Sequence, residues 1–90
     1  STRDINIVIN KSIFYQEVEN LITQAAIKNL TSFHLVNTFE GKGILKGFVS
    51  MTLRFTFQSN TKSLLESEIN KSMQMTLKLL EERLNAKIRS

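Results

Sequence analysis

The residues of this 90-residue chain that could take part in chemistry favour binding over catalysis. There is no cysteine and a single histidine, His34, so neither a thiol nucleophile nor a cysteine and histidine metal cluster is available. We interpret His34 as a strand residue near a sheet edge. Six of the eight acids fall in the two predicted helices, where carboxylates are typical of solvated surface. The sequence therefore predicts no catalytic residue and no metal ligand.

Basic residues form the clearest candidate site. Between residues 42 and 62 there are four bases and no acid: Lys42, Lys46, Arg54 and Lys62. The formal net charge is +4 and the isoelectric point is about 9.7, which is compatible with a nucleic-acid partner. Basic loops are also common on ordinary solvated surfaces, so the charge alone leaves both interpretations open.

The stretch from Val49 to Gln58 is the clearest strand. Its residues alternate with period two between an apolar face and a face rich in hydroxyl groups, which is the pattern of a strand covered on one side. The apolar face carries Val49, Met51, Leu53, Phe55 and Phe57, and the polar face carries Ser50, Thr52, Arg54, Thr56 and Gln58. The polar face is predicted to stay open to a polar partner.

The remaining elements follow from periodicity. Helical spacing predicts a helix that starts at residue 14 and ends near Asn29, and a second helix over about residues 65–84. Ser12 is the expected first N-cap, and Ser63 with Glu66 is the expected capping box of the second helix. Met73 and Met75 are expected to pack inside. Further strands are predicted over residues 3–9, 31–39 and 86–89. The order is that of an α+β, ferredoxin-like βαββαβ sandwich, a four-stranded antiparallel sheet with two helices on one face.

The parity of the strand over residues 31–39 is ambiguous. Hydrophobicity alone would turn Phe33, Leu35 and Phe39 inward, but the same face would then bury Asn37. The glycines that follow, Gly41, Gly43 and Gly47, are too loosely spaced for a phosphate-binding loop and favour a hairpin turn.

Length and the N-terminus give the remaining expectations. Ninety residues predict one domain, 1–90, and the early start of the first strand suggests a fragment of a longer chain. There is no long apolar run and no signal-peptide pattern, so we expect a cytoplasmic protein without a membrane segment.

Several motifs together resemble a known family. They are Arg3-Asp4-Ile5 at the start, residues 35–39 before Gly41, residues 48–50, residues 63–69 at the second helix, and Ile88-Arg89 at the end. In this order they resemble the ferredoxin-fold anticodon-binding domain that closes the beta subunit of bacterial phenylalanyl-tRNA synthetase.

The resemblance implies a binding site at the junction of the second and third strands. Val36 and Thr38 would face the core, and Asn37 and Phe39 would face outward near Ser50. Phe39 would stack on an anticodon base, and Asn37 and Ser50 would read polar base edges. Phosphates would be approached by Lys42, Lys46, Arg54 and Lys62. Asn37 stands where the family has Asp, and Phe39 where it has Tyr.

The resemblance also implies the parent enzyme. The domain itself would be noncatalytic and without a cofactor, binding phenylalanine tRNA, while a separate alpha subunit joins phenylalanine to the tRNA with ATP and magnesium. The parent would be an alpha2-beta2 heterotetramer in which this domain accompanies the remaining beta-subunit domains. The alternatives are a ferredoxin-like regulatory module that binds a small ligand or a partner at a sheet edge, and a module that only docks on other domains, both without RNA binding.

Overall fold

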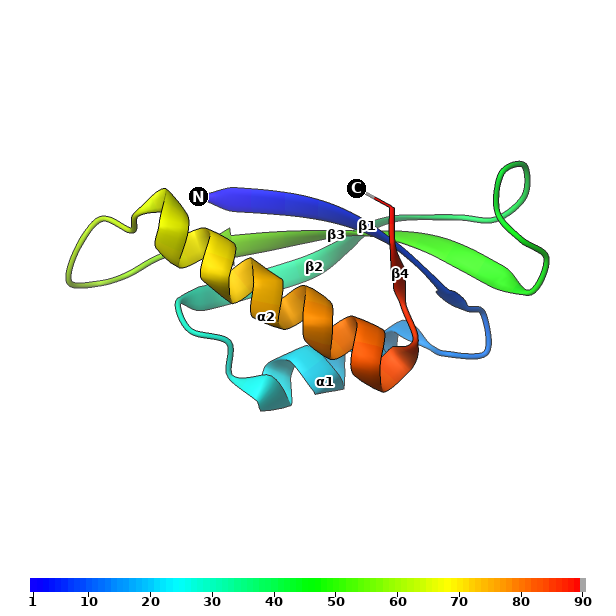
Figure 1. Ribbon diagram of the computed structural model, residues 1–90, viewed down its shortest axis with the longest axis horizontal. Coiled ribbons are helices and arrows are strands. Elements are labelled where there is room, and N and C mark those ends of the chain that lie inside the picture. The colour runs from blue at the N-terminus through cyan, green and yellow to red at the C-terminus, as the bar shows by residue number, and fades with distance from the viewer. Residues whose placement is uncertain (90) are drawn as a thin grey trace.

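The structure, a computed structural model, describes residues 1–89 and has the predicted element order (Figure 1). The elements are β1 (Thr2–Asn10), α1 (Tyr15–Ala25), β2 (Leu30–Phe39), β3 (Phe48–Phe57), α2 (Glu66–Leu84) and β4 (Lys87–Ile88). The four strands form one antiparallel sheet in the order β2-β3-β1-β4. This confirms the ferredoxin-like α+β fold.

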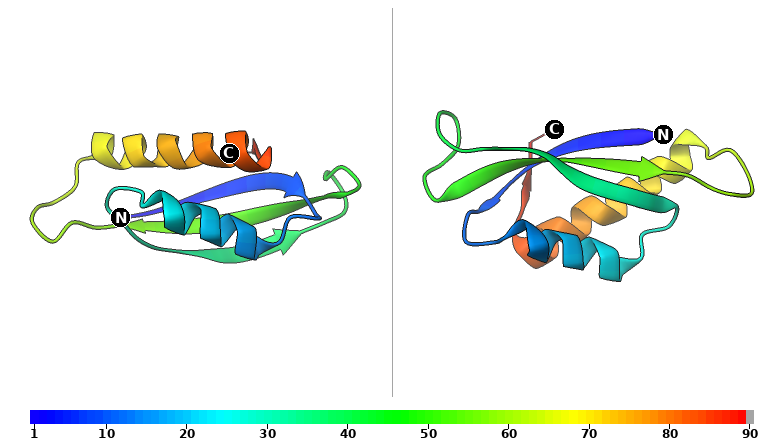
Figure 2. Two further views of the ribbon diagram at one scale, coloured as in Figure 1. Left: turned by 90° about the horizontal axis from the view of Figure 1, so that it is seen from below. Right: turned by 180° about the vertical axis from the view of Figure 1, so that it is seen from behind.

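Both helices cover the same face of the sheet, as the two views of Figure 2 show. The core consists of the inward-facing residues of the two central strands packed against the buried positions of the helices. On β1 and β3 these are Ile5, Ile7, Ile9, Val49, Met51, Leu53, Phe55 and Phe57. Burying each such side chain contributes about 1.5–3 kcal/mol, so the alternation of β1 and β3 determines which face the helices must cover.

The capping residue of each helix differs from the prediction, and α1 ends at Ala25 rather than near Asn29. The N-cap of α1 is Phe14, which is 72% exposed, rather than Ser12. Ser12 instead donates its backbone N–H to the side chain of Asn10, forming a local turn before the helix. The capping box predicted from Ser63 and Glu66 is also wrong, because α2 begins at Glu66.

Glu68 stabilises the first turn of α2. Its carboxylate accepts the backbone N–H of Leu65 at 3.1 Å and lies 2.9 Å from Lys62 Nζ. The hydrogen bond from Lys62, together with that of Leu65, lowers the pKa of Glu68 from its ordinary value. The acidic residue that completes the helix start is therefore Glu68, two residues after the Glu66 that the sequence pattern suggested.

The two methionines of α2 have different environments. Met73 packs in the core, as predicted, whereas Met75 is 57% exposed. The two positions are two residues apart, so they point to different sides of the helix. The prediction was therefore wrong for Met75.

A β-bulge at Val36 settles the parity of β2. Leu35 pairs with Leu53 and Asn37 with the adjacent residue Thr52, so Val36 is an extra residue on β2. Before the bulge Phe33 and Leu35 share the helix-covered face with Phe55 and Leu53. Odd-numbered residues of β2 therefore face the helices from Phe33 to Leu35 and face away from them from Asn37 onward.

Beyond the bulge, Phe39 pairs with Ser50 and Thr38 with Met51. Asn37 and Phe39 therefore face away from the helices, as the resemblance implied. Thr38 lies on the helix side of the sheet but is exposed, and Val36 is exposed as well. The expectation that these two residues pack into the core was wrong, because the helices do not reach this end of the strand.

The bulge makes a deletion test possible. Removing Val36 deletes the unpaired residue, so Asn37 should still face Thr52 and Phe39 should still face Ser50. Cross-strand NOEs between residues 37 and 52 would measure this pairing. Deleting Thr38 is the control: it should move Phe39 opposite Met51, onto the helix side. Loss of the 37–52 contacts on deleting Val36 would contradict the assignment of the bulge.

The lowered pKa of Glu68 predicts a pH-dependent contribution to stability. A carboxylate whose pKa is lowered by folding stabilises the fold above its unfolded pKa, and this contribution is lost as the pH falls through the folded pKa. Glu68→Gln should therefore lower the melting temperature at pH 7, and the difference from wild type should shrink as the pH falls below about 4.5. Thermal unfolding between pH 2 and 7 would measure this.

The control for Glu68→Gln is Glu81→Gln in the same helix, where the side chain is exposed near the C-terminal end. Removing a negative charge there does not weaken the helix start, and the negative end of the helix dipole favours the change slightly. A constant difference between wild type and Glu68→Gln at every pH would rule out the charged cap.

Candidate nucleic-acid interface

The face of the sheet away from the helices, which we name the open face, carries side chains in rows across the strands. One row contains Phe39, Ser50, Val8 and Lys87, and the next contains Asn37, Thr52 and Asn6. A third contains His34, Arg54 and Asp4. His34 lies on the edge strand β2, which confirms its interpretation as a residue near a sheet edge.

Phe39 and Asn37 are presented to solvent on this face. The Phe39 side chain is 49% exposed, and its ring end approaches the position that a side chain on Gly41 would occupy, at 4.0 Å. Gly41 has a positive φ of 117°, which side-chain-bearing residues rarely adopt. A glycine here therefore lets the chain turn directly after the end of β2.

Ser50 lies beside Phe39 but is not free to bind a ligand. It is 5% exposed, between Phe39 on β2 and Val8 on β1. Its hydroxyl donates a hydrogen bond to Oδ1 of Asn6. The structure thus brings Asn37, Phe39 and Ser50 together, as predicted, and gives Ser50 a partner inside the sheet.

Arg54 is also engaged within the sheet. Its guanidinium makes a bidentate ion pair with Asp4, with Nε 2.8 Å from Oδ1 and Nη2 2.9 Å from Oδ2. This hydrogen bonding lowers the pKa of Asp4 and raises the pKa of Arg54. The positive charge of Arg54 is therefore largely offset for a phosphate arriving at the open face.

The three lysines lie at opposite ends of the molecule. Lys42 and Lys46 are exposed in the loop that joins β2 to β3, next to the Phe39 end of the sheet. Lys62 follows β3 at its other end (Figure 1) and pairs with Glu68. The seven predicted residues therefore do not form one cluster, and Lys42 and Lys46 are the lysines near Asn37 and Phe39.

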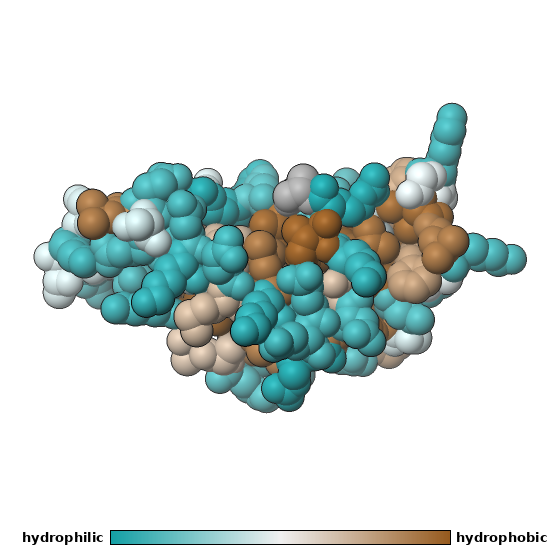
Figure 3. All heavy atoms as spheres, viewed as in Figure 1, coloured by the Kyte–Doolittle hydropathy of each residue, from teal (hydrophilic) through white to brown (hydrophobic). Residues whose placement is uncertain are grey.

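The β2–β3 loop is held to the end of β1 by two contacts. The backbone N–H of Lys11 donates to the carbonyl of Gly47 at 2.9 Å, and its Nζ lies 3.1 Å from Glu40 Oε1. The ion pairs of residues 1–89 leave Lys42 and Lys46 without an acidic partner. Hydrophobic residues gather on the surface at this end of the molecule (Figure 3). In the β2–β3 loop, Leu45 is exposed.

Comparison with known proteins shows the family. The ferredoxin-fold anticodon binding domain family matches residues 1–89. The chain belongs to this family. Among the similar proteins are phenylalanine–tRNA ligase beta subunits of Streptococcus agalactiae serotype Ia (32% identical), Streptococcus pyogenes serotype M18 (34%) and Streptococcus pneumoniae (33%). Each match covers 98% of this chain and 11% of the relative.

The sequence analysis assigned no binding role to three further polar residues of this anticodon-binding-family domain: Asn6, Lys87 and Arg89. β4 pairs with β1 through Val8 and Lys87, and the N–H of Arg89 donates to the carbonyl of Asn6 at 2.8 Å. Alternation about the inward Ile88 then places Lys87 and Arg89 on the open face. The alternation of the last four residues indicated that Lys87 and Arg89 share one face. Only the pairing of β4 with β1 shows that this face lies beside Asn6 and Val8.

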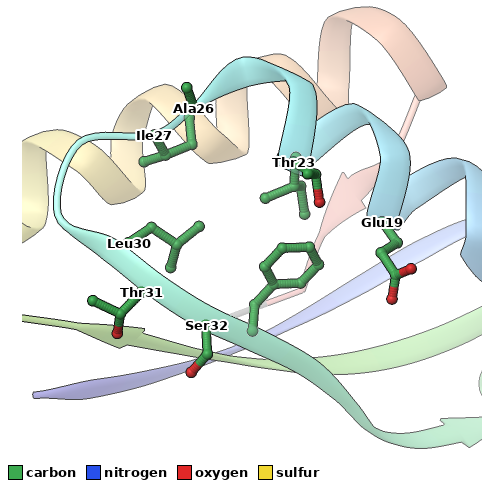
Figure 4. A pocket seen from close by; sticks show the side chains of 9 residues that line it. Glu19, Thr23, Ala26, Ile27, Leu30, Thr31 and Ser32 are labelled. Atoms are coloured by element: carbon green, nitrogen blue, oxygen red, sulfur yellow. The ribbon is translucent and has the colours of Figure 1, made fainter.

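A groove away from the β2–β3 loop has a different character. It has a volume of about 350 Å³ between the end of α1 and the start of β2, and Ile22, Ile27, Leu30 and Phe33 contribute to its lining. Glu19 and Thr23 of α1 lie on one side of it, and Leu30, Thr31 and Ser32 of β2 lie on the other (Figure 4). Its one charged residue is acidic, so it does not suit a phosphate, and none of the predicted site residues lines it.

The described residues bring together no group of three or more side chains of the histidine, cysteine, aspartate and glutamate types that could hold a metal. Neither helix of this described part has the length and hydropathy needed to cross a bilayer.

Proposed function

We propose that this domain binds the anticodon stem-loop of phenylalanine tRNA through its open face, as part of a phenylalanine–tRNA ligase beta subunit. The observation that carries the proposal is the half-exposed ring of Phe39 beside Asn37 on an uncovered sheet face. The family membership and the names of the relatives support the choice of RNA as the partner.

The contacts follow from the chemistry of single-stranded RNA. Unpaired bases can splay out, stack on an aromatic side chain and be read on their polar edges, and stacking contributes about 1–3 kcal/mol per base. Phe39 supplies the stacking surface. Asn37 lies two residues away on the same face, and its amide offers both donors and an acceptor to a base edge.

Lys42 and Lys46 approach the phosphates next to the stacked base. They extend from the loop that follows Phe39, and no acid among the described residues pairs with them. Arg54 and Lys62 have smaller roles in this proposal, because Asp4 and Glu68 already offset their charges. Lys87 and Arg89 add positive charge at the opposite edge of the sheet, where they are exposed.

The reaction of the parent enzyme takes place outside this domain in our proposal. The alpha subunit joins phenylalanine to tRNA with ATP and magnesium, in an alpha2-beta2 assembly in the cytoplasm, while this domain positions the anticodon arm. The described residues do not fit a magnesium site, so no chemical step is assigned to them. The composition of the assembly and the cytoplasmic location stay predictions.

Replacing the stacking side chain tests the proposal directly. Phe39→Ala should weaken binding of the labelled anticodon stem-loop of phenylalanine tRNA by about five- to a hundredfold, because it removes a stacking surface. Fluorescence anisotropy would measure the dissociation constant. Phe14→Ala is the matched control, since Phe14 is also an exposed phenylalanine but lies at the start of α1. Equal effects of the two substitutions would exclude stacking on Phe39.

The lysines predict a salt dependence that differs between the two ends of the domain. Each phosphate contact that is lost should reduce the slope of log K against log salt by about 0.7 for single-stranded RNA. We expect Lys42→Ala and Lys46→Ala to reduce the slope, and Lys62→Ala to leave it nearly unchanged. Titrations between 50 and 300 mM salt would measure it. A wild-type domain without salt-dependent binding would instead favour the regulatory or docking alternative.

A further inference from the structure

The centre of the open face contains an asparagine that the sequence reasoning did not consider. Asn6 lies on the central strand β1, opposite Thr52, and its side chain is half-buried. Its Oδ1 accepts the hydroxyl of Ser50 at 2.5 Å. Directly after β4, the backbone N–H of Arg89 donates to the backbone carbonyl of Asn6. Asn6 is therefore held by its neighbours on both sides.

We propose that Asn6 is a base-reading residue, with its amide NH₂ presented to an acceptor atom of an unpaired base and its orientation fixed by Ser50. This inference rests on the proposed function. An asparagine amide has one carbonyl acceptor and two N–H donors. Because Ser50 occupies the carbonyl side, the group left for a ligand is the donor side.

The environment of Ser50 supports this division of roles. Ser50 is nearly fully buried between Phe39 and Val8, so it cannot reach a base edge itself. It acts as a positioning residue for Asn6. In this proposal Asn6, rather than Ser50, contacts the polar edge of the base.

The position of Asn6 suits a nucleotide next to the one stacked on Phe39. The row that contains Asn6 also contains Asn37 and Thr52, and it adjoins the row of Phe39. Adjacent strands are about 4.8 Å apart, so Asn6 lies about 10 Å from the β2 edge along its row. Arg89 faces the open side of β4 next to Asn6 and adds a positive charge for the accompanying phosphate.

The ligand chemistry is therefore a base with acceptor atoms on its exposed edge. Guanine offers O6 and uracil offers O4, whereas adenine and cytosine carry exocyclic amino donors at the corresponding positions. The wild-type domain should prefer guanine or uracil at one loop position by about three- to tenfold, the range expected for one hydrogen bond.

The test uses Asn6→Asp in the domain spanning residues 1–90. Aspartate keeps the shape and still accepts the Ser50 hydroxyl, but it replaces the outward donor by an acceptor. Labelled anticodon stem-loops in which each unpaired nucleotide is replaced in turn by the other bases would be titrated against wild type and variant. At one position the preference for guanine or uracil should disappear or reverse. Asn20→Asp is the control, because it makes the same charge change at an exposed site on α1, on the other side of the sheet.

A second variant checks the role of Ser50. Ser50→Ala frees the amide of Asn6 to rotate, so it should reduce the base preference at the same loop position while leaving the salt slope unchanged. Melting temperatures of all variants would confirm that they fold.

The outcomes separate this inference from the proposed function. If wild type binds every stem-loop with the expected salt dependence but Asn6→Asp weakens all of them equally, the base-reading role of Asn6 is wrong and the proposed function survives. If wild type shows no salt-dependent binding to any stem-loop, the proposed function itself fails.

Discussion

The two-sided alternation of β1 and β3 is the constraint on which the rest of this domain depends. Both strands are central in the sheet, and their inward residues form most of the core. The apolar side must be covered by both helices, since uncovered isoleucines and phenylalanines would lose most of their contribution to stability. The chain has no third helix within residues 1–89 to cover the other side. An exposed polar sheet face is therefore a direct consequence of the fold.

The bulge at Val36 adapts an edge strand to this arrangement. Before it, Phe33 stacks on Phe55 with ring centroids 6.0 Å apart and completes the core. After it, the inward position of the strand, Thr38, is exposed. The extra residue turns Phe39 to the open face instead. Because Val36 is unpaired, Phe33 and Leu35 pack against the core, whereas Asn37 and Phe39 on the same strand lie in the proposed interface.

Ion pairs and hydrogen bonds decide which polar residues of the open face remain available to a ligand. Arg54 is committed to Asp4 and Ser50 to Asn6, while Lys42, Lys46, Lys87 and Arg89 have no acidic partner among the described residues. The available charges therefore lie at the loop and at the β4 edge, on either side of a neutral centre that contains Asn6, Asn37 and Thr52. Such a surface can hold a backbone at its rim and read bases in its middle.

Periodicity and composition were sufficient for the element order, the fold and the inward face of β3, because these depend on patterns local in the sequence. The resemblance added the outward direction of Asn37 and Phe39. The sequence placed the N-caps of the helices less well, at Ser12 and Ser63 rather than Phe14 and Leu65. Cap residues are set by backbone geometry and by contacts such as Glu68 with Lys62, which simple patterns do not encode.

Tertiary structure alone decided which residues share the site. The seven residues predicted for the site do not form one cluster along β3. Two of them are offset by acids: Arg54 pairs with Asp4, and Lys62 pairs with Glu68. Asn6 and Arg89 are 83 positions apart in the chain (89 minus 6) and became neighbours only through the pairing of β1 with β4. Strand order and register depend on contacts between distant segments, so the sequence determined the two faces of the sheet while the fold determined which side chains meet on them.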